Sequence, residues 1–271
     1  MYLSKTNPAA QQKAREISGI ARVLWQKGWA EGTAGNISLD VTEYYPGITL
    51  DFRTFPLIPL KKAYPDLAGH FLFVTRKSSR MREVADDPAN NLCLVKFNKA
   101  GNAYQLLFED LDHPNEPTSE LFTHFGIQEM FPLKGKGEKA VLHAHATELI
   151  ALSHIKEFQD EERLNDLLLR MHTETAFFIP DGIGFIPFEV PGSKELADKT
   201  LKSLQNHEVV LWEKHGCLCI GQSVSDAFDK IDMLSKAARL WLIGQNAGYD
   251  PQGLNKDQMK KLKALYDNIE F

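Results

Sequence analysis

Two histidines interrupt an apolar segment of the chain. His143 and His145 lie within "AVLHAHATELIAL", residues 140–152, where most of the other residues are hydrophobic. Side chains two residues apart on a β-strand point to the same face, so a strand here would place both imidazoles side by side. Two neutral imidazoles in that position can bind one metal ion, and His-x-His on a strand is a recurrent zinc-binding arrangement. The alternative is a pair of hydrogen-bonded histidines at a strand edge.

A third metal ligand is available in "VVLWEKHGCLCIG", residues 209–221. His215 follows a β-type apolar run, and Gly216 allows a close approach of the backbone. Catalytic zinc sites typically have three protein ligands and an open fourth position. Cys217 and Cys219 share a strand face with His215 and are rival ligands that would make a closed, structural site; otherwise they are small buried hydrophobic residues. The remaining histidines lie among polar neighbours, and most are expected to be solvated.

A carboxylate, Glu120, lies in the segment "HPNEPTSELF". A carboxylate held near a metal can remove the proton from a hydroxyl beside a scissile bond. The alternative is a capping glutamate in the first turn of a helix, where the helix dipole favours negative charge. Residue type and position alone favour the capping role.

The segment "GTAGNIS", residues 32–38, has the composition of an anion-binding turn. Its glycines let backbone N–H groups approach an anion, and Thr33 and Asn36 add side-chain donors. A plain turn that leads into a strand would use the same composition.

The elements that position these residues follow from hydrophobic periodicity. Apolar residues at helical spacing, with Pro8 near the start and Gly28 near the stop, predict a helix over residues 9–27. Apolar runs predict one strand after the "GTAGN" turn and others over residues 71–75, 92–97, 104–109, 139–146, 182–188 and 209–221. Further helices are predicted over residues 117–131, after a cap at Thr147, near Ser193, and near Ser223 or Ser225. Strands both cluster and alternate with helices, so the class is α/β with a mixed or antiparallel sheet flanked by helices.

Length and composition limit the classes of function. The 271 residues can bury a large core, and without repeats or long linkers they predict one domain over residues 1–271. A net charge of −5 and a pI near 6.0 argue against a nucleic-acid surface. No apolar run approaches the roughly 18 residues of a membrane span, and the polar N-terminus does not read as a signal peptide. Three cysteines, sparse and odd in number, favour a reducing cytoplasm.

Five motifs together resemble one known family. In this order, the chain contains "GTAGNIS", "PTSEL", "LHAHATELIAL", "IPDGIGFIPFEVPG" and "VVLWEKHG". They are similar to the class II aldolase/adducin family, and within it to the rhamnulose-phosphate branch, from about Leu24 to Gly248. The resemblance implies a three-layer α/β/α fold with a central, mainly antiparallel sheet. It also implies a homotetramer with active sites at subunit interfaces and one zinc ion (Zn2+) per chain, held by His143, His145 and His215.

The resemblance also assigns roles to individual residues. Glu120 in "PTSEL" matches the catalytic glutamate of the rhamnulose branch, and Glu174 in "MHTETAFFIPDG" matches an assisting glutamate near the subunit interface. The alternative for Glu174 is an ordinary acid on a surface helix. Thr33, Gly35 and Asn36 are implied to contact the sugar phosphate or the enediolate.

A second phosphate loop departs from the family pattern. Where the family has a Thr-Gly-Ser-Gly-like loop, this chain reads "FVTRKSSRMREV". Ser78 and Ser79 are kept as substrate-binding candidates, while Arg76 and Lys77 stand among the residues that replace the glycines. Fuculose-phosphate aldolases and pentulose-phosphate epimerases carry an acid directly after the serine pair, whereas here the first acid is Glu83, which favours the rhamnulose branch.

The resemblance therefore implies a zinc-dependent lyase whose substrate is a phosphorylated ketose. The reaction would cleave L-rhamnulose 1-phosphate to dihydroxyacetone phosphate and L-lactaldehyde, without a nucleic-acid or membrane partner. Within the same fold, another sugar-phosphate aldolase, an epimerase or a dehydratase is an alternative. A non-catalytic, adducin-like interaction module is a further one, although a scaffold has no reason to keep three histidines and an acid.

Overall fold

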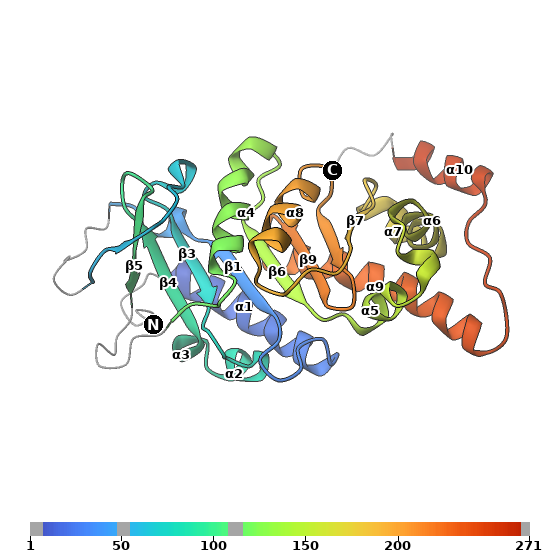
Figure 1. The fold of residues 1–271 in the computed structure, drawn as a ribbon, viewed down its shortest axis with the longest axis horizontal. Helices are drawn as coiled ribbons and strands as arrows, with labels where there is room; N and C mark the ends of the chain where they lie inside the picture. The colour runs from blue at the N-terminus through green and yellow to red at the C-terminus, as the bar shows by residue number, and fades with distance from the viewer. Residues whose placement is uncertain (1–7, 48–54, 108–115, 267–271) are drawn as a thin grey trace. The chain divides into compact units, whose positions relative to one another are not determined.

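The computed structural model describes residues 8–47, 55–107 and 116–266 (Figure 1). These residues form two compact units. The first contains the chain up to Ala144 together with Ile220–Ala227, and the second contains His145–Cys219 and the chain from Phe228 onward. Among the helices of the described ranges, none has the length and apolar character needed to cross a membrane. One domain over residues 1–271 stays a prediction.

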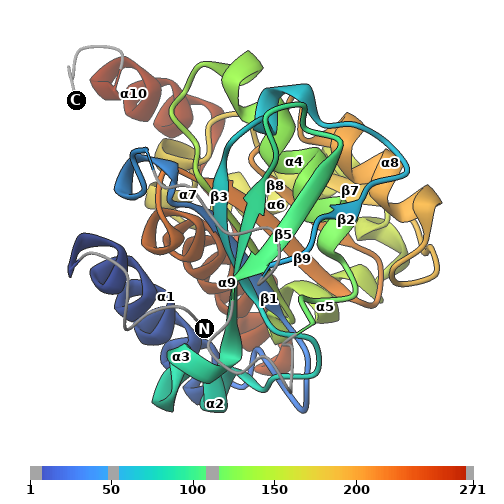
Figure 2. The same ribbon diagram turned by 90° about the vertical axis from the view of Figure 1, so that its left-hand side faces the viewer.

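The strands of the first unit form an antiparallel sheet in the order β2-β5-β4-β3-β1-β6. Their bounds are β1 Asn36–Asp40, β2 Ile58–Pro59, β3 Phe71–Thr75, β4 Leu92–Phe97, β5 Ala103–Leu107 and β6 Ala140–Ala144. Every residue of β3 and of β6 is buried, although neighbours along a strand point to opposite faces. Both faces of the sheet are therefore covered. Figure 2 shows α1 (Pro8–Gln26) and α4 (Leu121–Lys134) on opposite sides of these strands.

Helix α4 is anchored by aromatic packing. Phe125 is fully buried, and its ring packs edge-to-face against Phe97 of β4 with 4.6 Å between the ring centroids. Full burial of such a side chain contributes about 1.5–3 kcal/mol. On the other side of the sheet, α1 buries a stripe at helical spacing and contacts α2 (Met81–Asp86) and α3 (Pro88–Asn91). Helix α4 is thus held in a defined position over β3 and β4.

The second unit has a shorter sheet. In it, β7 (Ile183–Ile186) pairs in parallel with β8 (Val209–Trp212), and α8 (Lys194–Ser203) lies between them in the chain. Strand β8 then pairs antiparallel with β9 (Gly216–Gly221). The other helices of this unit are α5 Thr147–Ser153, α6 Glu161–Met171, α7 Thr173–Phe178 and α10 Lys256–Tyr266, while α9 Val224–Asn246 has its first residues in the first unit and the rest in the second. Turns of 3-10 helix lie at Thr42–Tyr44 and Pro65–Leu67 in the first unit and at Lys156–Phe158 in the second.

The α/β class with a central, mainly antiparallel sheet is confirmed, as are the helix near residues 9–27 and the strands over 71–75 and 92–97. Four details differ. The predicted strand over 209–221 is two strands joined by a turn, and the one over 139–146 ends at Ala144. The helix predicted from residue 117 begins at Leu121, and Thr147 is the first residue of α5, not its cap. Residues 108–109 of the predicted strand over 104–109 lie outside the described ranges.

Two of the predicted helix caps are present. The Ser193 hydroxyl accepts a hydrogen bond from the backbone N–H of Leu196. Of the two serines proposed to begin the later helix, Ser223 accepts a hydrogen bond from the N–H of Asp226.

Candidate active site

The three predicted metal ligands lie close together. Ring nitrogens of His143, His145 and His215 all lie within 4.8 Å of one another, and no other group of three such ligands is found within the described ranges. Zinc–nitrogen bonds of about 2.0–2.1 Å would place tetrahedral ligands about 3.4 Å apart, which is within the limit of 4.8 Å that these ring nitrogens keep. Three neutral nitrogen donors suit zinc and similar divalent metals. The group therefore fits a metal ion with three protein ligands.

The ligands come from different local structures. His143 is a buried residue of β6, whereas His145 lies just beyond the end of that strand. His215 lies in the turn between β8 and β9, and its ring packs edge-to-face against His145 with 5.3 Å between centroids. The expectation that both residues of the His-x-His pair lie within one strand is therefore wrong for His145. The turn requires Lys214 at a φ of 58°, a conformation that a non-glycine residue rarely adopts.

Neither rival cysteine belongs to this ligand group. Cys217 and Cys219 are buried within β9. Burial raises the pKa of Cys217 to about 12, so its thiol stays protonated near neutral pH. A protonated thiol is a poor metal ligand, which agrees with the interpretation of these residues as small hydrophobic side chains.

Glu120 directs its carboxylate toward β1. It occupies the N-cap position of α4, but its side chain makes no capping hydrogen bond. Instead, Glu120 Oε2 accepts a hydrogen bond of 2.8 Å from Nδ2 of Asn36. Asn36 is opposite His143 in the antiparallel register of β1 and β6. Glu120 therefore lies at the start of α4, as the capping alternative requires, but it makes no capping hydrogen bond.

A buried histidine lies behind Asn36. His124 of α4 is 0% exposed, and its Nε2 lies 2.5 Å from Asn36 Oδ1. Its Nδ1 lies 2.8 Å from the hydroxyl of Ser38. The pKa of His124 is lowered to about 4, and burial is the main cause. The negative charge of Glu120 acts to raise this pKa, and the charge of His143 acts to lower it. The imidazole is therefore neutral near pH 7.

The turn before β1 needs glycine at one position. Gly35 has a φ of 80°, and a Cβ there would lie 3.1 Å from the carbonyl oxygen of His143. Both the left-handed backbone and this close approach favour glycine. Thr33 is exposed in the same turn. The turn leads into β1, whose first residue, Asn36, lies opposite His143.

The loop after β3 forms a tight turn beside the segment that precedes Glu120. Ser79 is buried and donates its hydroxyl hydrogen to the carbonyl oxygen of Arg76, while Ser78 is exposed with a φ of 58°. The ammonium of Lys77 lies 2.8 Å from the carboxylate of Glu116, and both side chains are largely exposed. The backbone of Lys77 also donates to the carbonyl of Glu116. The serine pair and Glu120 are thereby held on neighbouring segments.

The chain matches a known protein family over most of its length. Residues 15–242 match the model of the family described as "Class II Aldolase and Adducin N-terminal domain". This chain belongs to the class II aldolase and adducin family. It is a lyase, and class II aldolases depend on a metal ion.

Named relatives of this class II aldolase agree with the family match. A protein of Bacteroides thetaiotaomicron named rhamnulose-1-phosphate aldolase is 34% identical over 97% of both chains. A protein of the same name from Yersinia pseudotuberculosis is 33% identical over 90% of this chain and 89% of its own. The crystal structure of a sugar-phosphate aldolase from Thermotoga maritima has a TM-score of 0.72 and 32% identity, and the match covers 90% of this chain and all of that one.

Glu174 lies in the first turn of α7, where its carboxylate is about half exposed. It accepts a hydrogen bond of 2.6 Å from the Thr173 hydroxyl and lies 3.0 Å from His172 Nε2. The bond from Thr173 is the largest cause of the lowered pKa of Glu174. Glu174 is therefore ionised and accessible.

His124 was not predicted as a site residue; it belongs to the histidines with polar neighbours, most of which were expected to be solvated. The signal was available: Glu120, His124 and Gln128 are spaced four residues apart, which places them on one face of a helix. Polar residues at that spacing beside the candidate base indicate a shared role. For His124 this expectation of solvation is wrong, because neighbours along the chain do not show which face of a helix packs against a sheet.

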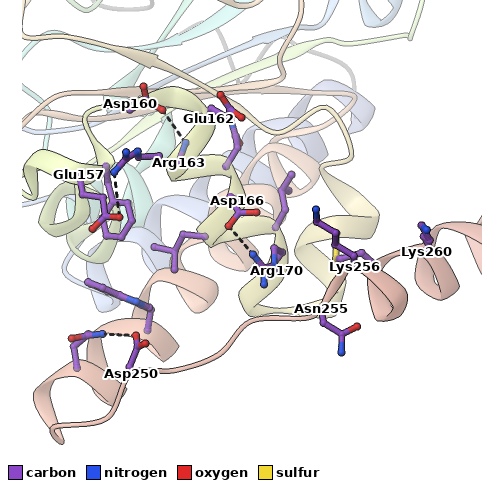
Figure 3. A pocket seen from close by; sticks show the side chains of 17 residues that line it. Glu157, Asp160, Glu162, Arg163, Asp166, Arg170, Asp250, Asn255, Lys256 and Lys260 are labelled. Atoms are coloured by element: carbon purple, nitrogen blue, oxygen red, sulfur yellow. Dashed lines mark hydrogen bonds and ion pairs between the residues drawn. The ribbon is translucent and has the colours of Figure 1, made fainter.

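A cavity of about 1430 Å³ lies elsewhere in the second unit, beside α6, α9 and α10 (Figure 3). Its lining contains none of the predicted site residues. Several of its charged groups bind one another. Asp166 lies 2.8 Å from Arg170, and Glu157 lies 3.5 Å from Arg163.

Proposed function

We propose that this class II aldolase is zinc-dependent and cleaves L-rhamnulose 1-phosphate to dihydroxyacetone phosphate and L-lactaldehyde. The observation that carries the proposal is the placement of Asn36, which pairs across the sheet with the candidate ligand His143 and binds the carboxylate of Glu120. Asn36 thereby connects the candidate acid–base group, Glu120, with the strand that carries the candidate metal ligand His143. The names of the relatives supply the substrate.

His143, His145 and His215 would hold the metal ion. When bound, zinc supplies Lewis acidity toward ketose oxygens and stabilises the negative charge that develops after cleavage. Glu120 would take the proton from the hydroxyl beside the scissile carbon–carbon bond. It would return a proton to the carbon that becomes part of dihydroxyacetone phosphate, so that no net proton is consumed.

The remaining assignments concern binding and assembly. Thr33, Gly35 and Asn36 would contact the phosphate or the enediolate, and Ser78 and Ser79 would form the second half of the phosphate site. Ser79 supports the turn through the carbonyl of Arg76. Exposed Ser78 can therefore face an anion. Glu174, accessible and ionised, would assist at a subunit interface of a homotetramer, and three cysteines, sparse and odd in number, favour a cytoplasmic enzyme.

The test is a change of Glu120 to glutamine. Purified Glu120→Gln should keep its fold and its metal content but lose roughly 100-fold or more in turnover of L-rhamnulose 1-phosphate, the usual scale for general acid–base catalysis. The matched control is Glu129→Gln, on the same helix, whose carboxylate lies 3.8 Å from Lys62. Wild-type protein should lose activity in a chelator and act best on this substrate within a panel of ketose 1-phosphates. Near-normal turnover in Glu120→Gln would contradict the assignment.

A further inference from the structure

A continuous line of polar side chains runs from Glu120 into the interior of the first unit. Asn36 binds Glu120 at 2.8 Å, and His124 lies 2.5 Å from the amide oxygen of Asn36. The Ser38 hydroxyl is 2.8 Å from the other nitrogen of His124, and Gln128 donates to that hydroxyl at 3.1 Å. Except for Glu120, every member is buried. Such a buried network is stable only when each donor meets an acceptor.

The hydrogen bonds of this line have one consistent direction. Asn36 presents its amide N–H to the carboxylate, so its carbonyl oxygen faces His124 and needs a donor there. Nε2 of His124 must therefore carry the hydrogen. Its Nδ1 is then an acceptor for the Ser38 hydroxyl, whose oxygen in turn accepts from Gln128. The low pKa of His124 agrees with this neutral form.

Two elements supply these residues at matching spacings. Glu120, His124 and Gln128 follow one face of α4 at four-residue intervals. Asn36 and Ser38 are two residues apart on β1 and therefore share a face of that strand. The line is thus the contact between one helix face and one strand face, and Phe125 holds the helix against the sheet.

We infer that His124 is a positioning residue for the reaction: its Nε2–H fixes the amide of Asn36 so that Asn36 donates to Oε2 of Glu120. This inference rests on the proposed role of Glu120. Because Oε2 is bound by Asn36, Oε1 is the oxygen that exchanges protons with the substrate. Without the imidazole donor, the buried amide oxygen of Asn36 has lost its partner at His124, and the amide is no longer held at its present angle. The N–H that Asn36 gives to Glu120 Oε2 would then move, and Glu120 would lose the donor that fixes its position. His124 itself does not touch the substrate.

The experiment compares His124→Met, which fills the space without a donor, with His124→Gln, whose amide can place an N–H near the position of Nε2. His124→Met should lower kcat about 10-fold or more, which corresponds to about 1.4 kcal/mol of barrier. KM and metal content should change little, and His124→Gln should recover most of kcat. The matched control is Gln105→Met on β5, which removes a buried side-chain donor to the carbonyl oxygen of Phe55. Its kcat should equal that of the wild type.

Two outcomes would overturn the inference. One is a kcat for His124→Met within about two-fold of wild type, a difference too small for a lost buried donor. The other is an equal loss in the Met and Gln variants together with loss of metal, which indicates a structural role only. Glu120→Gln is measured in parallel, because its normal turnover would instead reject the proposed function.

A second measurement does not depend on activity or on the folding of His124→Met. In wild-type protein labelled with 15N-histidine, the resonances of His124 are assigned by their absence from His124→Gln. Near pH 7 they should show a neutral ring protonated at Nε2. A ring protonated at Nδ1 would reverse the hydrogen bonds to Asn36 and Ser38, and the inference would be wrong.

Discussion

Acidification should destabilise the native protein through His124. Its pKa is about 4 in the folded chain, because the ring is fully buried, against an ordinary value of 6.5. Between these two values the unfolded chain binds a proton that the native chain does not. The stabilisation is therefore complete above about pH 6.5 and is lost as the pH falls toward 4. At about 1.4 kcal/mol per pH unit, the total is about 3 kcal/mol, of which about 2 kcal/mol is lost by pH 5.

The assay is urea unfolding of wild-type protein and His124→Gln at pH 7, 6 and 5. Both proteins are treated with chelator, because competition between protons and metal would otherwise contribute, and both are measured at one protein concentration. Other groups titrate alike in the two proteins, so the difference between their free energies of unfolding isolates His124. Relative to the variant, wild type should lose about 2 kcal/mol between pH 7 and pH 5. A difference constant within about 0.5 kcal/mol would refute the reasoning, since His124 would then protonate as readily in the native state as in the unfolded chain.

Two further predictions concern the metal and the loop after β3. Wild-type protein should carry about one divalent metal ion per chain, and elemental analysis of His143→Ala should show that most of the metal is lost. The control is His154→Ala, which changes an exposed histidine outside the ligand group and should retain the metal. A wild-type metal content in His143→Ala would contradict the assignment of His143 as a ligand. Lys77→Ala breaks only an exposed ion pair and should change KM for the ketose phosphate by less than about two-fold. Ser79→Ala removes a buried hydrogen bond of the turn and should raise KM by about 3–10-fold, with weaker inhibition by inorganic phosphate. A larger increase of KM in Lys77→Ala than in Ser79→Ala would show that the cation, and not the turn, binds the phosphate.

Local periodicity was sufficient for the regular elements. Strands β3 and β4 have the bounds predicted from apolar runs, and α1 differs from its prediction by one residue at each end. The run over residues 209–221 was misjudged because its apolar character continues across the turn at residues 213–215, and the left-handed Lys214 carries no sequence signal of the kind that glycine provides. The start of α4 was misjudged because Pro117 and the polar residues after it suit both a helix start and an extended segment.

The sequence by itself determined which side chains share a face. Spacing of four residues in a helix aligns Glu120 with His124, and the composition of the turn before Asn36 allows the backbone to approach a neighbouring strand. Only the tertiary structure decided which faces meet. The antiparallel register of β1 and β6 places Asn36 opposite His143, and packing of α4 on the sheet brings His124 to Asn36. The reason is physical: periodicity follows from the local geometry of the backbone, whereas the choice of a partner face depends on burial and hydrogen bonding between residues about 90 positions apart in the chain.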